Sequence, residues 1–448
     1  MRIIVVANPF LELGGGARRA FEVVTRYTNH SVEPILFIPY NGLYRAILAK
    51  IRTGLVDKKT ILNEFNKVFN YLSIMGVIIP NNVWSVLEEI LSVVKNDLKR
   101  RITIHRLLGT KRVEYETSNK YLEDVEAFNV DFVYSLHEVI DAVVMASYIA
   151  SKISKPFGIL LQSNPYYEDL KTVFHLLSME GWSIPRLSIK HLLASYTNTY
   201  IKKIYLNDIV RNPKLRFIVS VSEAPFMYSG LRKYCRCTRS LHPANAYDSE
   251  LIKYRNTSNK DDYAVFSARL TCEKGILEIP YIWRKVVSKL PDAKLIITGI
   301  FSKQKVKTEF ERLLKKFNLN RNVEYLGYVS KDDHVKILSK AKVLVYPSHI
   351  DAFPLIVLES LALGTTVVAY DIPAIRSIYK DVKAVLTVPE YDVNAMAYKV
   401  INILKMDSNR LAKLHEDELT LRFLSTYGSW DEVVKAEIRM ISEAIRTS

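Results

Sequence analysis

The sequence contains only three cysteines among 448 residues, Cys235, Cys237 and Cys272. Three cysteines make neither an even disulfide set nor a four-ligand metal pattern, so we expect neither a disulfide framework nor a zinc site. The motifs HExxH, GxSxG and CxxC are also absent. Their absence excludes the common zinc-enzyme and serine-hydrolase interpretations.

Long hydrophobic runs are missing as well. A helix that crosses a membrane needs roughly 18 consecutive apolar residues or more. The longest candidate segment, residues 130–150, is interrupted by Asp131, His137, Glu138 and Asp141. We therefore expect no transmembrane helix.

The amino terminus does not resemble a secretion signal. Met1-Arg2 leads directly into residues 3–7, an apolar segment typical of a buried strand. With few cysteines and no leader, the sequence predicts a cytoplasmic protein. A hydrophobic content of 49% and a charged content of 25% are typical of a globular protein, and 448 residues suffice for two domains with separate cores.

Basic residues exceed acidic ones by 16. Residues 181–241 hold eleven Lys or Arg and two acids (11 − 2 = +9), and residues 95–112 hold seven and one (7 − 1 = +6). Because apolar residues interleave with both stretches, a surface that sits on anionic lipid at the inner face of a membrane is one interpretation. An ordinary solvated face and a nucleic-acid surface are the alternatives, and we do not expect nucleic acid.

The second half of the chain alternates strands and helices, which predicts a parallel, doubly wound sheet. The first half opens in the same way, and a polar stretch at residues 247–262 has the composition of a linker. The expected strands are residues 3–7, 34–38, 132–136, 157–161, 217–221, 263–267, 294–298, 323–326, 343–346 and 365–369.

The stretch from Tyr346 to Tyr370 places a carboxylate where ordinary packing would not. Pro354 suits the start of a helix and Gly364 the residue after its last turn, and the residues between them are apolar on nearly all sides. This pattern predicts a buried helix whose only charge is Glu359.

A carboxylate on such a helix is costly unless it is paired, hydrogen-bonded or kept for a ligand. Asp351 lies eight residues earlier, in the loop after a predicted strand, where open α/β sheets bind ligands. The two acids could bracket an elongated polar ligand. Satisfaction of Glu359 by a neighbouring arginine or a backbone amide is the alternative.

Other residues could contribute to the same kind of site. Arg269 follows one strand and Lys274 lies just after it, so two cations at a helix start would suit a diphosphate. Gly14 to Gly16 precede the first helix and would let backbone amides approach a phosphate or a sugar, or they form a flexible turn. His137 ends another strand, where its imidazole could bind a ligand hydroxyl or be satisfied within the fold.

Four segments of the second half resemble, in order and spacing, the donor-binding domain of the retaining glycosyltransferases of family 4, the glycosyl transferases of group 1. They are SARLTCEKG, LIITG, VEYLGYVSKDDHVKILSKAKVLVYPS and DAFPLIVLESLALGTTVVA. The resemblance implies the GT-B fold, an α/β architecture of two Rossmann-like, doubly wound parallel-sheet domains facing across a cleft. The domains would be residues 1–250 and 251–424, and residues 425–448 would cross back to the first domain.

The resemblance also implies roles for individual residues. Glu359 would bind the donor ribose, Asp351 would lie near the sugar, and Arg269 and Lys274 would hold the diphosphate. His137 would act from the first domain and counts, with Asp351 and Glu359, among the expected catalytic residues. The remaining expected donor contacts are Gly15, Gly16, Gly299, Tyr328, Phe353 and Leu355.

A hexosyltransferase is the function that this resemblance implies. It would move a hexose from a UDP- or GDP-linked sugar to a lipid-linked or membrane-proximal glycan and retain the configuration, with no metal or other cofactor. A catalytically weak GT-B partner subunit that binds a glycan or a nucleotide sugar is one alternative. A nucleotide-sugar epimerase of the same fold is another.

Overall fold

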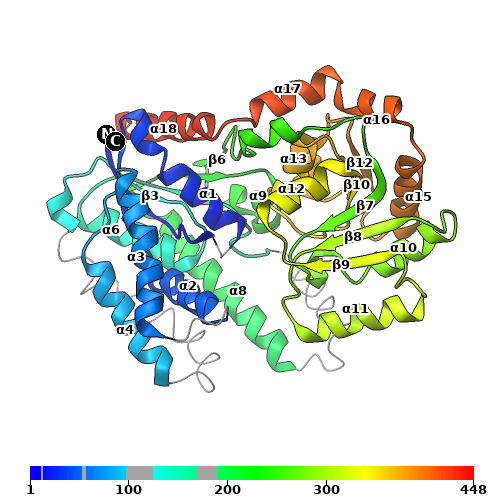
Figure 1. Cartoon of the computed structure of the whole chain (residues 1–448). Coiled ribbons are helices and arrows are strands. Elements are labelled where there is room, and N and C mark those ends of the chain that lie inside the picture. Colours follow the sequence, from blue (N-terminus) through cyan, green and yellow to red (C-terminus); the bar gives the residue numbers. More distant parts are fainter. Residues whose placement is uncertain (12–13, 53–56, 97–124, 169–188, 448) are drawn as a thin grey trace.

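The structure, a computed structural model, describes all residues except 12–13, 53–56, 97–124, 169–188 and 448. It has two lobes, each built on a six-stranded sheet with helices against it (Figure 1). Every strand pair in both sheets is parallel. The predicted α/β architecture with two doubly wound sheets is therefore confirmed.

The first sheet has the strand order β2-β1-β3-β4-β5-β6. Strand β1 lies between β2 and β3, so the direction in which strands are added reverses there, and the loops after β1 and β3 flank the crevice at the sheet edge. The strands are β1 (Arg2–Val6), β2 (Glu33–Phe37), β3 (Phe132–Ser135), β4 (Phe157–Leu161), β5 (Leu215–Ser220) and β6 (Thr238–Ser240). The short polar strand β6 was not predicted, because three residues show no periodicity.

The helices of the first lobe surround this sheet. Residues 58–74 and 82–96, between the second and third strands of the chain, are helical. The helices are α1 (Gly15–Val24), α2 (Tyr40–Arg52), α3 (Lys58–Ile74), α4 (Asn82–Asn96), α6 (Ile140–Lys152), α8 (Ile189–Val210) and α9 (Ala224–Ser229).

The second sheet has the order β9-β8-β7-β10-β11-β12, with its reversal between β7 and β10. The arrowheads of β8 and β9 point toward the first lobe in Figure 1, so the carboxyl ends of these strands face the other half of the molecule. The strands are β7 (Asp261–Ser267), β8 (Lys294–Thr298), β9 (Val323–Gly327), β10 (Ala341–Tyr346), β11 (Thr366–Tyr370) and β12 (Val385–Val388).

The helices of the second lobe alternate with these strands and then continue along the top of the lobe (Figure 1). They are α10 (Ile279–Val287), α11 (Gln304–Lys316), α12 (Lys331–Lys340), α13 (Leu355–Ala362), α14 (Pro373–Tyr379), α15 (Val393–Leu404), α16 (Ser408–His415) and α17 (Glu418–Thr426).

The chain passes between the lobes at two places that lie side by side. The Tyr247 amide donates to the Tyr427 carbonyl at 3.0 Å, and the Tyr247 hydroxyl donates to the Leu424 carbonyl at 3.2 Å. After the second crossing, helix α18 (Trp430–Arg446) runs beside α1 of the first lobe (Figure 1). The last helix thus packs on the opposite lobe from the helices that precede it.

A buried ion pair fixes α18 to α1. Arg19 Nη2 lies 2.6 Å from Glu437 Oε1, and the two side chains are 1% and 0% exposed. Tyr27 donates its hydroxyl to the other Glu437 oxygen at 2.5 Å, and Arg19 Nε donates to the Ala244 carbonyl at 2.8 Å. These partners engage both Glu437 oxygens and two of the three Arg19 nitrogens, as a buried charge pair requires, and Arg19 Nη1 has no hydrogen-bond partner among the described residues.

One expectation about the cysteines is wrong. Cys235 and Cys237 are joined by a disulfide, with their Cα atoms 5.4 Å apart. A cysteine count cannot detect this pair, because a bridge between residues two apart depends on the local chain path before β6.

No helix in the described ranges is long and apolar enough to cross a membrane.

Candidate active site

Helix α13 carries the carboxylate that the sequence singled out. Its buried residues include Val357, Leu358 and Leu361, and Glu359 is its only charged side chain. The helix ends at Ala362, and Gly364, just after the capping residue, has a left-handed φ of 79°. A Cβ there would lie 2.4 Å from the Asn256 carbonyl oxygen, so the predicted glycine stop is confirmed.

The linker between the lobes satisfies the carboxyl end of the same helix. Arg255 Nη1 donates to the carbonyls of Leu361, at 2.6 Å, and Ala362, at 3.3 Å. Arg255 Nη2 donates to the His415 carbonyl at 3.0 Å. A guanidinium at this end complements the helix dipole and fills carbonyls that have no partner within the helix.

Glu359 pairs with an arginine of the first lobe. Arg18 Nη1 lies 2.7 Å from Glu359 Oε1, and the side chains are 30% and 14% exposed. Burial alone would lower the pKa of Arg18, but the charge of Glu359 and the hydrogen bond to it raise that pKa above its usual value. An arginine therefore satisfies Glu359, which was the alternative to a role in ligand binding. This arginine comes from the facing lobe, however, and its side chain is accessible to solvent.

A histidine that the sequence analysis missed lies near this pair. His334, on α12, has its Nε2 2.8 Å from Ser267 Oγ, and Ser267 accepts a bond from Thr298 Oγ1 at 2.8 Å. Burial lowers the pKa of His334, the charge of Glu359 opposes that effect and the charge of Arg18 adds to it. The lowered pKa favours a neutral His334 imidazole near the Glu359 carboxylate.

Asp351 and Lys274, predicted to act on the sugar and the diphosphate, contact each other. Lys274 Nζ lies 2.5 Å from Asp351 Oδ2, which also accepts from the Tyr346 hydroxyl at 2.6 Å. Burial would raise the pKa of Asp351, but the charge of Lys274 and these hydrogen bonds keep it below its usual value. Asp351 is therefore a carboxylate, and its oxygens are already engaged.

The close approach of two loops produces this contact. Lys274 ends a short 3-10 turn (Cys272–Lys274) rather than opening a helix, as the sequence had suggested; α10 begins at Ile279. Gly275 follows with φ at 78°, and a Cβ on it would lie 2.1 Å from the Pro347 carbonyl oxygen. Only glycine allows the loop after β7 to lie this close to the loop after β10.

A second histidine that the sequence analysis missed holds the loop after β10. His349 is 3% exposed; its Nδ1 lies 2.7 Å from Glu390 Oε1, and its Nε2 contacts Glu278. Its ring stacks on Tyr391 with the centroids 4.3 Å apart. Burial would lower the pKa of His349, but the two glutamates raise it above the usual value, which favours an imidazolium between two carboxylates.

The first lobe brings two predicted residues together. A Cβ on Gly16 would lie 3.8 Å from His137 Cε1 and 3.2 Å from Gln162 Oε1. His137 is 9% exposed, and its Nε2 has no hydrogen-bond partner among the described residues. Burial lowers its pKa, so the imidazole is neutral. A buried polar nitrogen without a partner calls for an explanation, and a ligand hydroxyl would supply one.

The two lobes meet where these residues lie. A Cβ on Gly15, at the start of α1, would lie 3.6 Å from Leu355 Cδ1, at the start of α13. Ser222, just after β5, donates its hydroxyl to the Ala352 carbonyl at 2.5 Å. The glycine loop of the first sheet therefore faces the loop and helix after β10 of the second.

Three other predicted residues are exposed or fixed in the backbone. Arg269 is exposed and forms no ion pair within the described ranges. Gly299 has a φ of 120°, and a Cβ there would lie 1.9 Å from the Ala268 carbonyl oxygen, so no other residue fits. Tyr328 is 80% exposed.

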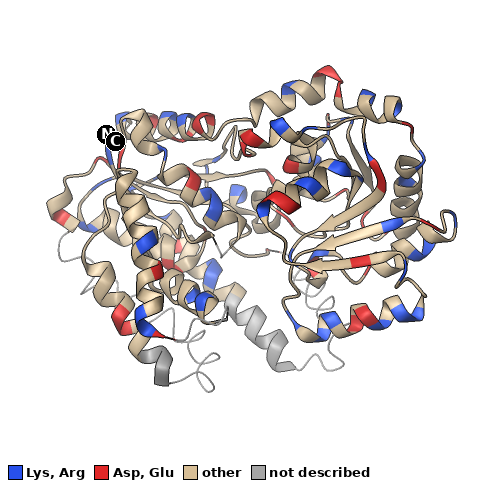
Figure 2. Ribbon diagram, in the orientation of Figure 1, with Lys and Arg blue, Asp and Glu red and all other residues tan. Residues whose placement is uncertain are grey.

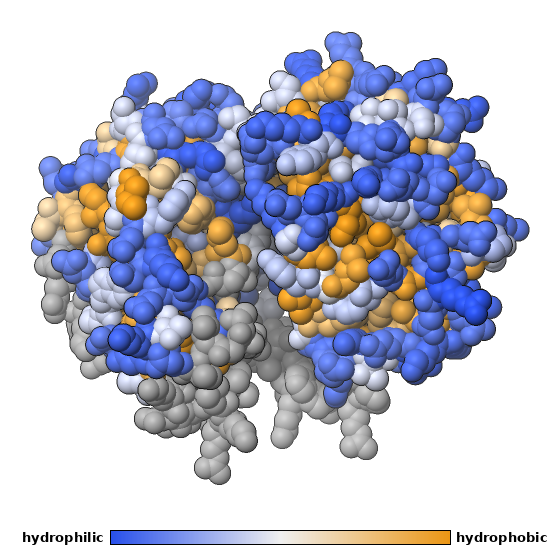
Figure 3. Space-filling model, in the orientation of Figure 1, coloured by the Kyte–Doolittle hydropathy of each residue, from blue (hydrophilic) through white to orange (hydrophobic). Residues whose placement is uncertain are grey.

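In Figure 3, apolar surface appears on the second lobe over strands β7 to β9.

Phe353 does not present its ring to the site. It is 8% exposed and packs against Tyr379 and Tyr427, with centroids 6.3 and 5.7 Å apart. Any contact between this residue and a ligand would therefore involve its backbone.

Comparisons with known proteins match the second lobe to a family. Residues 248–417 match the family described as Glycosyl transferases group 1. The phosphatidyl-myo-inositol mannosyltransferase of Mycolicibacterium smegmatis is 27% identical over 175 residues, 38% of this chain and 42% of that protein. The poly(glycerol-phosphate) alpha-glucosyltransferase of Bacillus subtilis is 28% identical over 155 residues, 34% of this chain and 22% of that protein. The match thus spans less than half the length of these relatives.

Solved structures resemble the whole chain. Sucrose-phosphate synthase from Thermosynechococcus elongatus has a TM-score of 0.67 at 14% identity, with all of both chains covered. HepE from Anabaena, solved with UDP and glucose, has a TM-score of 0.61 at 13% identity, covering 99% of this chain and 100% of that one. At such low identity, these structures establish the fold. The chain has the GT-B fold, and residues 248–417 of its second lobe match the glycosyl transferases of group 1.

Proposed function

We propose that this chain is a retaining hexosyltransferase that takes a sugar from a UDP- or GDP-linked donor and passes it to a lipid-linked or membrane-proximal glycan. The match of residues 248–417 to the glycosyl transferases of group 1 supports the reaction class. Two relatives are named as a mannosyltransferase and a glucosyltransferase, and the Anabaena protein was solved with UDP and glucose.

One observation carries the proposal. The crevices at the switch points of the two sheets face each other: Gly15 and Gly16 follow β1, and Leu355 and Glu359 follow β10. Ligands of open α/β sheets bind at such crevices. Two of them in contact suit a donor held between the lobes, with its nucleotide on the second lobe.

The charges around this contact suit a diphosphate leaving group. As the bond to the sugar breaks, negative charge develops on the diphosphate, and preorganised cations and amides stabilise that charge. We assign this role to Arg269, to Lys274 and to the backbone amides at the start of α1. Two of the three N–H groups of the Lys274 ammonium bond Asp351 and Ile350, so the third is left for a phosphate. The first turn of α1 contains no acid that would repel a phosphate.

Glu359 and His137 suit hydroxyl groups of the donor. A carboxylate accepts hydrogen bonds from the two ribose hydroxyls, and a neutral imidazole can donate to or accept from a sugar hydroxyl. The acceptor then attacks on the face from which the diphosphate leaves, which retains the configuration, and the diphosphate takes the acceptor proton. The proposal uses no metal.

A location at the inner face of a membrane also belongs to the proposal. Its support is the net charge of +16 and the two basic stretches of the first lobe. Residues 97–112 of the first stretch and residues 181–188 of the second lie outside the described residues. In the described part, basic and acidic residues are interspersed over both lobes (Figure 2).

A release assay tests the reaction. The wild type and Glu359→Ala would be incubated with a panel of UDP- and GDP-sugars, and release of the nucleoside diphosphate would be measured. We expect wild-type turnover with at least one donor and a fall of roughly 10- to 100-fold in kcat/KM in the variant, since a hydrogen bond to a charged group is worth ~1.5–3 kcal/mol. Glu309→Ala, at a surface pair with Arg312 on α11, is the control and should keep wild-type activity.

The alternatives give different results in the same assay. A binding subunit would retain the donor without any release, with or without added acceptors. An epimerase would convert the donor into a new nucleotide sugar without an acceptor. Equal activity of the wild type and Glu359→Ala would contradict the placement of the donor.

A further inference from the structure

The ion pair between Arg18 and Glu359 occupies the carboxylate to which the proposed function assigns the donor ribose. The bond joins residues 341 positions apart and links α1 to α13. Because the Arg18 side chain is 30% exposed, the pair is not sealed inside the protein. Arg18 holds one oxygen of this carboxylate, Oε1, so the ribose and Arg18 compete for that atom.

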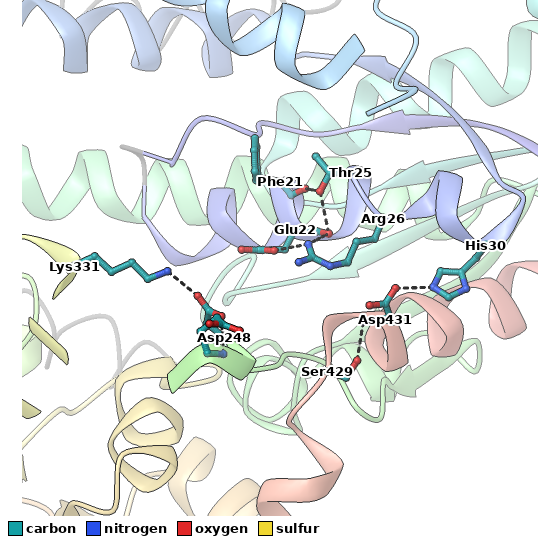
Figure 4. Close-up of polar contacts among 10 residues, drawn as sticks. Phe21, Glu22, Thr25, Arg26, His30, Asp248, Lys331, Ser429 and Asp431 are labelled. Atoms are coloured by element: carbon teal, nitrogen blue, oxygen red, sulfur yellow. Dashed lines mark hydrogen bonds and ion pairs between the residues drawn. The ribbon is translucent and has the colours of Figure 1, made fainter. Parts of the chain in front are cut away.

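Arg18 makes no second ion pair in the described part of the chain. Glu22 and Asp248 are close enough for their charges to raise the pKa of Arg18, but each has another partner. Glu22 contacts Arg26, and Asp248 Oδ2 lies 2.6 Å from Lys331 Nζ (Figure 4). If Glu359 binds another ligand, Arg18 therefore has no unpaired acid nearby among the described residues to replace it, because Glu22 and Asp248 already form ion pairs.

The position of Arg18 offers a different partner. Arg18 lies in the first turn of α1, and its amide donates to the Gly14 carbonyl at 3.0 Å. The free amides of Gly15 and Gly16 belong to the same turn, which attracts anions. A guanidinium carries five N–H donors in a planar fork that matches a phosphate, and one of its nitrogens, Nη1, is engaged here with Glu359.

We propose that Arg18 exchanges partners when the donor binds: it holds Glu359 in the donor-free protein and moves to the diphosphate when the ribose hydroxyls take the carboxylate. This inference rests on the proposed function and adds a residue to it. Arg18 thus screens Glu359 from a nucleoside without phosphate and favours a nucleoside diphosphate.

The exchange predicts opposite effects of one substitution on two ligands. In Arg18→Gln, uridine should bind more tightly than to the wild type because its competitor for Glu359 is gone. UDP should bind more weakly because its diphosphate loses the guanidinium. The ratio of the uridine Kd to the UDP Kd should fall about tenfold or more, which corresponds to ~1.4 kcal/mol. Guanosine and GDP replace this pair if GDP is the nucleotide that binds.

Matched variants separate the exchange from a structural effect. Arg312→Gln removes a surface arginine of α11, paired with Glu309 on the same helix, and should leave the ratio unchanged. Arg18→Lys keeps the charge without the planar fork and should lie between Arg18→Gln and the wild type. It also serves as the test if thermal unfolding shows that Arg18→Gln is not folded.

The outcomes are distinguishable. A fall in the ratio in Arg18→Gln, with none in Arg312→Gln, supports the exchange. An unchanged ratio, or an equal loss of affinity for both ligands, overturns it while UDP binding by the wild type leaves the proposed function intact. Failure of the wild type to bind any nucleoside diphosphate overturns the proposed function and the exchange with it.

Discussion

At the scale of single residues, His349 stabilises the loop that carries Asp351. Its imidazole lies between Glu278 and Glu390, and the Tyr370 hydroxyl also contacts Glu278. The histidine is buried, and the two glutamates hold its pKa above the usual value. The loop after β10 is therefore held by an ion cluster whose cation, the His349 imidazolium, has a pKa above its usual value.

This arrangement predicts a pH-dependent stability. A raised pKa in the folded state means that the stabilisation is complete below the unfolded-state pKa of about 6.5 and is lost as pH rises through the higher folded-state pKa. The free energy of unfolding should therefore be higher in the wild type than in His349→Gln. This difference should be largest near pH ~6 and should shrink toward pH ~9. Urea unfolding of both proteins across this range measures it. A difference that is constant with pH would show that His349 acts by packing alone.

The candidate site could be predicted from the sequence where each signal is local. Glu359 stands out because its helix is otherwise apolar, and Asp351 and His137 stand out because each follows a strand. The partner of Glu359 could not be predicted, because Arg18 lies 341 residues away and its pairing depends on how the lobes meet. His349 was missed because its two glutamates come from separate elements, with no pattern along the chain.

At the scale of elements, helix α18 fixes the position of α1 and hence of the glycine loop. Trp430, Val433 and Ile441 are buried, and Glu437 is the buried acid that pairs with Arg19. Near the start of α18, Asp431 contacts His30 at 2.9 Å, as Figure 4 shows. Because Arg19 adjoins Arg18, the same helix turn anchors α1 and presents the arginine that reaches Glu359.

Removing the buried charge of Glu437 should therefore be costly. Glu437→Gln leaves the Arg19 guanidinium buried without its counter-ion, which typically destabilises a protein by ~3–5 kcal/mol. Glu432→Gln is a control on the same helix: its pair with Lys435 is about half exposed, and its loss should cost less than ~1 kcal/mol. Urea unfolding of the two variants compares these effects. Equal, small losses would mean that the buried pair does not hold α18 in place.

At the scale of the whole molecule, the strand and helix pattern was enough to predict two doubly wound sheets. Strands such as β4 and β11 are apolar, β-branched or aromatic, and bounded by turn residues, so the sequence identifies them. The contacts between the two lobes could not be predicted in this way. Contacts such as Gly15 with Leu355 depend on the crossing of the chain at Tyr247 and Tyr427, which has no local signal.

The meeting of the lobes also explains why the candidate site needs both of them. In Figure 3 the two lobes are separated by a furrow on the face shown. Gly15, Arg18 and His137 come from one side, and Asp351 and Glu359 from the other. A change in the angle between the lobes would alter the Arg18–Glu359 distance, since that bond spans the junction.

The account depends on Glu359 binding the ribose of a nucleotide-linked donor. The most direct measurement is the affinity of wild type and Glu359→Ala for the nucleoside diphosphate and for its 2′,3′-dideoxy analogue, by calorimetry. We predict that the wild type binds the ribonucleotide about tenfold or more tightly than the analogue, and that Glu359→Ala binds the two about equally. An equal preference for the ribose in both proteins would contradict the account.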